Sequence, residues 1–172
     1  MFRAFYPDRY MVSAYVIDFE ELYKKGYRGL IFDIDNTLVP HGAPADDRAI
    51  RLFERLKKIG FQCCLISNNK EPRVKMFNEK IQVAYVYDAH KPSKKNYIKA
   101  MEIMGTDQAN TLFVGDQLFT DVWGAKRVGI HNILVHPINP KEEIQIVLKR
   151  YLEKIVLHFY KKSKKRLKKV AN

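Results

Sequence analysis

Short apolar runs alternate along this chain with segments in which apolar residues recur every three or four positions. The apolar runs are bounded by turn residues and predict five buried strands: residues 27–32, 61–66, 83–87, 111–114 and 131–135. The periodic segments predict helices over residues 18–26, 46–58, 72–81, 93–104 and 120–128. Strands that alternate with helices are typical of parallel βαβ units. The pattern therefore predicts an α/β fold with a three-layer, Rossmann-like parallel sheet in residues 1–140.

Polar residues follow four of the predicted strands. They are Asp33, Asp35, Ser67, Asn68, Lys91, Asp116 and Asp121. In a parallel α/β sheet, the residues just beyond the carboxyl ends of the strands meet at one edge. A carboxylate beside a core strand is costly unless it is paired or bound to a metal. One acid could be a helix cap, but four strand ends with polar residues indicate a functional site.

The chemistry of these residues suits phosphoryl transfer. Asp33, Asp116 and Asp121 offer the oxygen ligands that Mg²⁺ prefers, and a cation would relieve their mutual repulsion. An ionised aspartate can attack phosphorus, while a second carboxyl protonates the leaving oxygen and then activates water. Lys91 and the Ser67 hydroxyl suit the charge on the phosphoryl oxygens. Asn68 suits either a hydrogen bond near the phosphate or a local turn.

The same residues resemble the four ordered motifs of haloacid-dehalogenase-like (HAD) hydrolases across residues 27–135. The motifs are Asp33-Ile-Asp35-Asn-Thr37-Leu, Ser67, Lys91-Pro92 and Gly115-Asp116-Gln-Leu-Phe-Thr-Asp121. The resemblance implies that Asp33 is the nucleophile and a metal ligand, and that Asp35 is the acid/base, with its backbone carbonyl on Mg²⁺. It further implies that Asp116 binds the metal and that Asp121 supports the metal or Lys91. Ser67 and Lys91 would hold the phosphoryl group, and an aspartate at Asp35 is typical of phosphatases and mutases.

Spacing between the motifs bears on the substrate. Residues 37–67 and 67–91 each hold little more than a loop, one helix and one strand. HAD hydrolases carry their substrate-selecting caps in these two places, so the resemblance implies a core without a cap domain. Capless members tend to act on bulky or macromolecular substrates, or to borrow a lid from a partner.

Charge is concentrated at the end of the chain. The chain has 172 residues and a net charge of +12, of which +9 lies in residues 149–172. From Ile144 onward, apolar residues recur at helical spacing, and a lysine run follows them. Residues 141–172 therefore predict a basic amphipathic helix and tail. The apolar positions are Ile144, Leu148, Tyr151, Ile155 and Phe159. Residues 144–170 suit an anionic membrane surface; the alternative is a helix packed on the core with a solvated tail.

Two further features bear on the location of the protein. Cys63 and Cys64 are adjacent in an apolar run, which favours buried small hydrophobes and a reducing compartment. No segment has the roughly 20 apolar residues that span a bilayer, and the N-terminus lacks the apolar run of a signal peptide. We expect a cytoplasmic protein that associates with a membrane only at its surface. The aromatic residues of the N-terminus suit either a membrane interface or, as we expect, a cover over the sheet.

Residues 23–40, after an N-terminal Pro-Asp-Arg-Tyr, resemble the YqeG-type branch of HAD subclass IIIA. That branch is similar to the phosphatases that convert phosphatidylglycerophosphate to phosphatidylglycerol in phospholipid biosynthesis. The resemblance implies a Mg²⁺-dependent phosphatase with this lipid as its leading substrate. One alternative is the same chemistry on a nucleic-acid end, a phosphoprotein or a small phosphate ester. The other is a basic nucleic-acid- or ribosome-binding protein with little activity, although such a protein has no need of Asp35 and Lys91 together.

Overall fold

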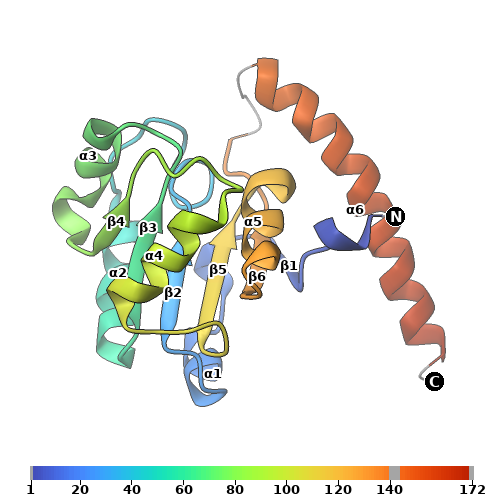
Figure 1. The fold of residues 1–172 in the computed structure, drawn as a ribbon, viewed down its shortest axis with the longest axis horizontal. Coiled ribbons are helices and arrows are strands. Elements are labelled where there is room, and N and C mark those ends of the chain that lie inside the picture. The colour runs from blue at the N-terminus through green and yellow to red at the C-terminus, as the bar shows by residue number, and fades with distance from the viewer. Residues whose placement is uncertain (1, 140–143, 171–172) are drawn as a thin grey trace.

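A six-stranded parallel sheet forms the centre of the molecule (Figure 1). The computed structural model describes residues 2–139 and 144–170, and only the backbone of residues 144–148 and 166–170. The strand order is β1-β6-β5-β2-β3-β4. The strands are β1 (Arg9–Met11), β2 (Gly29–Phe32), β3 (Gln62–Ile66), β4 (Ala84–Val86), β5 (Thr111–Gly115) and β6 (His131–Val135). The predicted three-layer α/β fold is confirmed.

Helices cover both faces of the sheet (Figure 1). The helices on the two faces are α1 (Phe19–Lys24), α2 (Asp47–Ile59), α3 (Glu71–Ile81), α4 (Lys94–Met104) and α5 (Trp123–Arg127), and α6 (Ile144–Val170) comes after β6. Side chains of α1, α2 and α3 pack in one apolar cluster with Leu30 and Phe32 of β2. Side chains of α4 and α5 pack in a second cluster with Ile31, the residue between them. Alternate residues of β2 therefore face opposite layers of the core, as strand geometry requires.

Local signals in the sequence place several helix ends correctly. The Asp18 and Asp46 carboxylates accept the backbone N–H groups of Glu21 and Ala49, each at 2.8 Å, at the starts of α1 and α2. Gly60 ends α2 with φ +111°, a conformation that favours glycine. Burial raises the pKa of Cys63 and Cys64 to about 12, which agrees with their expected apolar setting.

The helix predicted over residues 120–128 differs from the structure. A π-helical turn, η3 (Leu118–Val122), comes first, and α5 follows it. The Asp121 carboxylate accepts the backbone N–H groups of Asp116 and Gln117, at 3.1 and 3.0 Å. These hydrogen bonds draw the turn back over the end of β5, and π-helical turns of this kind are frequent at functional sites.

The N-terminal segment supplies a strand that the apolar pattern does not predict. β1 has three residues and pairs with β6 at the edge of the sheet. Two short 3₁₀ turns, η1 (Arg3–Phe5) and η2 (Ala14–Val16), flank it. Phe2, Phe5, Tyr6 and Tyr10 pack against a small apolar cluster: Leu118, Val122, Leu134 and Val156. The aromatic N-terminus therefore covers the edge of the sheet, as expected, and it also joins this edge to α6, which was not predicted.

Helix α6 lies beside the β1 edge and extends away from the body of the molecule (Figure 1). The sequence predicts a helix and then a basic run, whereas in the structure one helix continues through that run to Val170. Val156 and Tyr160 are buried, and Tyr151 and Ile155 are exposed. The side chains of Ile144 and Leu148, also predicted in the apolar stripe, lie outside those described. In the described part of the chain, no helix has the length and apolarity to cross a membrane.

Candidate active site

Asp33 stands at the end of β2, in the middle of the sheet. Its backbone N–H continues the ladder by donating to the Val114 carbonyl at 3.0 Å. Its buried carboxylate accepts a hydrogen bond from Lys91 Nζ at 2.5 Å, through Oδ1. The Thr37 hydroxyl lies 3.2 Å from Asp33 Oδ2 and 3.0 Å from Asp116 Oδ1. The strand and these two neighbours therefore hold Asp33 in one orientation.

Asp116 and Asp121 approach Asp33 from the end of β5 and from η3. Besides accepting the two backbone N–H groups, Asp121 accepts a hydrogen bond from Lys91 Nζ at 2.7 Å. A Cβ atom at Gly115 would overlap the Asp121 carboxylate, so this close approach requires glycine. One carboxylate oxygen from each of Asp33, Asp116 and Asp121 lies within 4.8 Å of the others. The structure thus brings together the three acids whose convergence the sequence predicts.

The electrostatics of this cluster suit a divalent cation. Burial raises the pKa of Asp33 to about 6, although Lys91 acts in the opposite direction. Burial and repulsion from Asp33 raise the pKa of Asp116 well above its ordinary value, against the effect of Arg150. Burial lowers the pKa of Lys91, but attraction to Asp121 and Asp33 outweighs it and the pKa rises. Buried, mutually repelling carboxylate oxygens are the donors that Mg²⁺ prefers, so these residues fit the metal that the HAD resemblance implies.

Asp35 has a different environment from the other acids. Its carboxylate accepts hydrogen bonds from Asn69 Nδ2, Arg73 Nη2 and the Gly42 backbone, each at 2.8 Å. Its side chain does not belong to the group of three acids around the candidate metal position. This separation suits an acid/base whose side chain is kept for proton transfer. Neither Asn69 nor Arg73 is among the site residues predicted from the sequence. Asn69 lies three residues beyond β3 and Arg73 lies in the first turn of α3, and the only signal was that two polar residues four apart follow this strand end.

The remaining predicted residues line a pocket of about 260 Å³ together with Asp33 and Asp35. Ser67 is buried at the end of β3, and its hydroxyl accepts the Asn69 N–H at 3.1 Å. Asn68 Oδ1 accepts the backbone N–H of Lys91 at 2.7 Å. Asn68 therefore braces the loop that carries Lys91, which is closer to the turn role considered for it, while it also borders the pocket.

Two residues of α6 that are not among the predicted site residues reach the site. Arg150 forms an ion pair with the Asp116 carboxylate and donates to the Asp116 carbonyl at 2.6 Å. Glu153 is buried, pairs with Arg150 at 2.9 Å and accepts the Leu118 N–H at 2.7 Å. A signal was present, because Glu153 is the one acid among ten basic residues in positions 149–172. A lone acid in so basic a helix indicates a specific partner.

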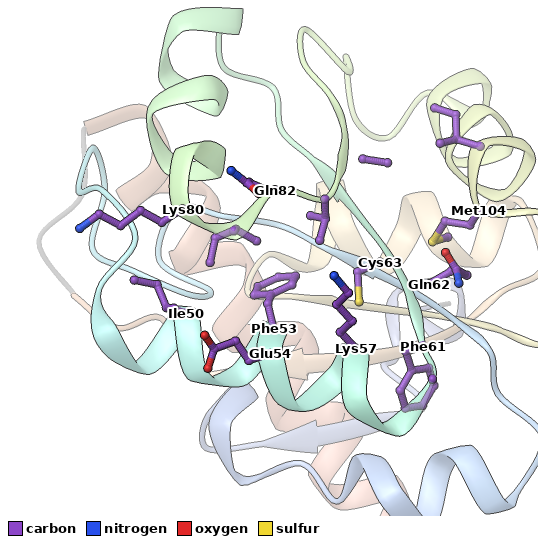
Figure 2. Close-up of a pocket in the computed structure, with 15 residues that line it drawn as sticks. Ile50, Phe53, Glu54, Lys57, Phe61, Gln62, Cys63, Lys80, Gln82 and Met104 are labelled. Carbon is purple, nitrogen blue, oxygen red and sulfur yellow. The ribbon is translucent and has the colours of Figure 1, made fainter.

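Another hollow, of about 510 Å³, lies at the opposite end of β3 (Figure 2). Figure 2 shows side chains from α2, from the start of β3 and from the end of α3 around it, among them Lys57, Gln62 and Lys80. It contains none of the predicted site residues. Since ligands of open α/β sheets bind beyond the carboxyl ends of the strands, we assign the site to the smaller pocket.

Comparisons with known proteins agree with this site. Residues 88–137 match the model of the HAD-hydrolase-like family. The chain is 36% identical over 159 residues to "Probable phosphatase YqeG" of Bacillus subtilis, covering 92% of both proteins. It is 28% identical over 158 residues to the chloroplastic/mitochondrial phosphatidylglycerophosphate phosphatase 1 of Arabidopsis thaliana, covering 80% of this chain and 45% of the plant protein.

Solved structures show the same fold. A HAD-superfamily, subfamily III A hydrolase from Legionella pneumophila superposes with a TM-score of 0.55 at 18% identity, covering 70% of this chain and 71% of the other. The fold, the ordered motifs and the extent of the match to the Bacillus protein lead to one conclusion. The chain is an enzyme that belongs to the YqeG-type phosphatases of the HAD-like hydrolases.

Proposed function

We propose that this phosphatase hydrolyses phosphate monoesters through an aspartyl-phosphate on Asp33, and that its site requires Mg²⁺. The observation that carries the proposal is the convergence of Asp33, Asp116 and Asp121, the first and last of which contact Lys91, at a pocket that Asp33, Asp35, Ser67 and Lys91 line. Asp33, Asp116 and the backbone of Asp35 would hold the ion, with Asp121 supporting them. When bound, Mg²⁺ would offset negative charge between the carboxylates and the phosphate.

Each protein group has a role in the first half-reaction. A carboxylate oxygen of Asp33 attacks phosphorus, and the bond from phosphorus to the substrate's ester oxygen breaks. Lys91 and the Ser67 hydroxyl face the charge on the phosphoryl oxygens. Asp35, held by Arg73 and Asn69, gives its proton to the leaving oxygen, so that an alcohol departs.

The second half-reaction regenerates the enzyme. Water attacks the phosphorus of the aspartyl-phosphate while Asp35 accepts its proton. The bond from phosphorus to Asp33 breaks, inorganic phosphate leaves and Asp33 returns to its carboxylate form. The brace of Arg73 and Asn69 keeps Asp35 in the same place for both proton transfers.

We further propose that the substrate is phosphatidylglycerophosphate and that α6 docks the enzyme on an anionic membrane. The likeness to the Arabidopsis phosphatase supports this lipid. The connections β2–β3 and β3–β4 each contain one α-helix, which leaves the pocket uncapped by a domain inserted there. Four apolar side chains of α6 are 44–68% exposed: Tyr151, Leu152, Ile155 and Phe159. Exposed lysines of the same helix accompany them, and this combination favours an anionic lipid surface.

The test is Mg²⁺-dependent release of phosphate from a substrate panel. The panel contains phosphatidylglycerophosphate in anionic vesicles, phosphatidic acid, an aryl phosphate and oligonucleotides with 5′- or 3′-phosphates. We expect selective turnover of the first lipid, abolished in Asp33→Asn and by chelation of Mg²⁺. Turnover of the aryl phosphate alone would retain the mechanism and reject the lipid. Salt-sensitive RNA binding without phosphate release would favour the nucleic-acid-binding alternative.

Docking is tested separately by co-sedimentation with anionic vesicles. The double variant Leu152→Ser, Ile155→Ser removes exposed apolar surface from α6. It should lose vesicle binding and keep its rate on the soluble aryl phosphate. Unchanged binding to vesicles would reject α6 as the docking element.

A further inference from the structure

Helix α6 contributes to the pocket a side chain that is not one of the proposed catalytic residues. Asp33, Asp35, Ser67 and Lys91 line the pocket from positions just beyond the ends of strands, whereas Lys149 lines it from α6. Lys149 is exposed, so its ammonium group can meet a ligand that enters from solvent. The pocket therefore has two positively charged lysines on its wall, one deep and one at its outer side.

Contacts of the neighbouring residues determine the position of Lys149. Arg150, the next residue, donates to the Asp116 carbonyl at 2.6 Å and pairs with its carboxylate. One turn later, Glu153 accepts the backbone N–H of Leu118 at 2.7 Å. These contacts attach α6 to the end of β5 and to η3. The ion pairs of Arg150 and Glu153 therefore fix the backbone of Lys149 beside the pocket.

The two lysines have different partners. Lys91 Nζ contacts Asp33 at 2.5 Å and Asp121 at 2.7 Å, next to the proposed nucleophile, so it would face the phosphate that reacts. Within the residues that the structure describes, Lys149 has no hydrogen bond or ion pair of this kind. Its charge remains for an anionic group of the substrate that does not react.

We propose that Lys149 determines specificity by binding a second anionic group, so that the enzyme selects phosphate monoesters that also carry a phosphodiester. This inference rests on the proposed function and adds to it the residue that would recognise the diester of the proposed substrate. A lysine acts on phosphate as a point charge, and the diester is unchanged in the reaction. Its binding energy therefore stabilises the ground state and the transition state alike, which lowers KM and leaves kcat unaltered.

The experiment compares two soluble substrates. One is a short-chain phosphatidylglycerophosphate below its micelle-forming concentration, which has a monoester and a diester; the other is glycerol 3-phosphate, which has the monoester alone. In Lys149→Gln we expect KM for the first to rise roughly twofold to fivefold, the range of an exposed ion pair. KM for glycerol 3-phosphate and both kcat values should stay constant, and Lys149→Arg should restore most of the preference.

The matched control is Lys154→Gln. Lys154 is exposed on the same helix but does not line the pocket, and its loss removes the same charge. An equal rise in KM for both substrates, an equal effect of Lys154→Gln, or no effect of Lys149→Gln would each overturn the inference. The Asp33→Asn variant should not hydrolyse either substrate, so their dissociation constants can be measured in it. Adding Lys149→Gln must weaken binding of the lipid and leave binding of glycerol 3-phosphate unchanged. If the parent enzyme releases no phosphate from either substrate, the proposed function fails, and this binding measurement still decides the role of Lys149.

Discussion

The carboxyl edge of the sheet and the outer face of α6 are two charged regions built in opposite ways. At the sheet edge, Asp33, Asp116 and Asp121 are buried and each has specific hydrogen-bond partners. On α6, apolar side chains and lysines are exposed to solvent, and the helix is attached chiefly through Arg150, Glu153 and a few aromatic contacts. Burial with fixed partners makes each charge at the sheet edge specific for one neighbour, whereas the exposed charges on the outer face of α6, away from the pocket, have no ion-pair partner in the described part of the chain and suit any anionic surface. The first arrangement suits chemistry and the second suits adhesion.

After the loss of turnover expected in Asp33→Asn, the largest effect should come from Asp35, the proposed proton-transfer residue. Asp35→Asn keeps the size of the side chain and one acceptor oxygen for Arg73 and Gly42 but removes the acid/base, so we expect kcat to fall about 10²- to 10⁴-fold. Steady-state release of phosphate from a soluble aryl phosphate measures it. Replacing Lys161, Lys162, Lys164 and Lys165 by glutamine should change the same rate less than about threefold, since exposed charges far from a site are screened. Similar losses in the two variants would contradict the distinction between the regions.

A matched pair of leucines tests the same contrast in stability. Leu56 of α2 is fully buried, whereas Leu152 of α6 is 52% exposed. Leu56→Ala should lower the free energy of unfolding by about 2–5 kcal/mol, because it leaves a cavity in the core. Leu152→Ala should change it by about 0.5 kcal/mol or less. Urea unfolding followed by circular dichroism measures both, and a large loss in Leu152→Ala would mean that the outer face of α6 is covered in solution.

The attachment of α6 depends on Arg150. Arg150→Gln removes the charge that pairs with Asp116 and Glu153, so the helix should open more often. We expect backbone hydrogen exchange in residues 150–160 to accelerate about tenfold to a hundredfold, as loss of a charged hydrogen bond predicts. Exchange in β2 and β5 should remain unchanged. Equal acceleration in the strands would show that α6 and the sheet unfold as one unit.

The smallest effect concerns single lysines of α6. A basic residue near an anionic surface contributes about 1 kcal/mol, so Lys162→Gln should weaken vesicle binding about fivefold. Lys57→Gln, on α2 and away from α6, should leave it unaltered. Vesicle co-sedimentation at low and physiological salt measures both constants. If the two substitutions weaken binding equally, the net charge of the protein, and not the position of lysines on α6, determines its affinity for anionic vesicles.

Much of the core could be predicted because its signals are local. Alternation of apolar runs with helical periodicity identified five of the six strands, and Asp18, Asp46 and Gly60 marked helix ends through their own side chains or backbone. β1 could not be predicted, because three residues at a sheet edge are too few to show a periodic pattern of apolar residues. The π-helical turn could not be predicted either. Its shape depends on the hydrogen bonds that Asp121 accepts from the backbone of Asp116 and Gln117, and no residue preference indicates it.

The sequence by itself determined which residues stand at the ends of the strands, because β2, β3, β4 and β5 are specified by apolar patterning and parallel strands must end at a common edge. From this followed the set Asp33, Asp35, Ser67, Lys91, Asp116 and Asp121 and the likeness to the HAD hydrolases. Only the tertiary structure decided that Arg73 and Asn69 hold Asp35, and that α6 brings Lys149, Arg150 and Glu153 to the pocket. Contacts between segments far apart in the chain depend on how the helices pack. Because lysines are spread along α6, the sequence does not reveal which of them faces the pocket and which faces water.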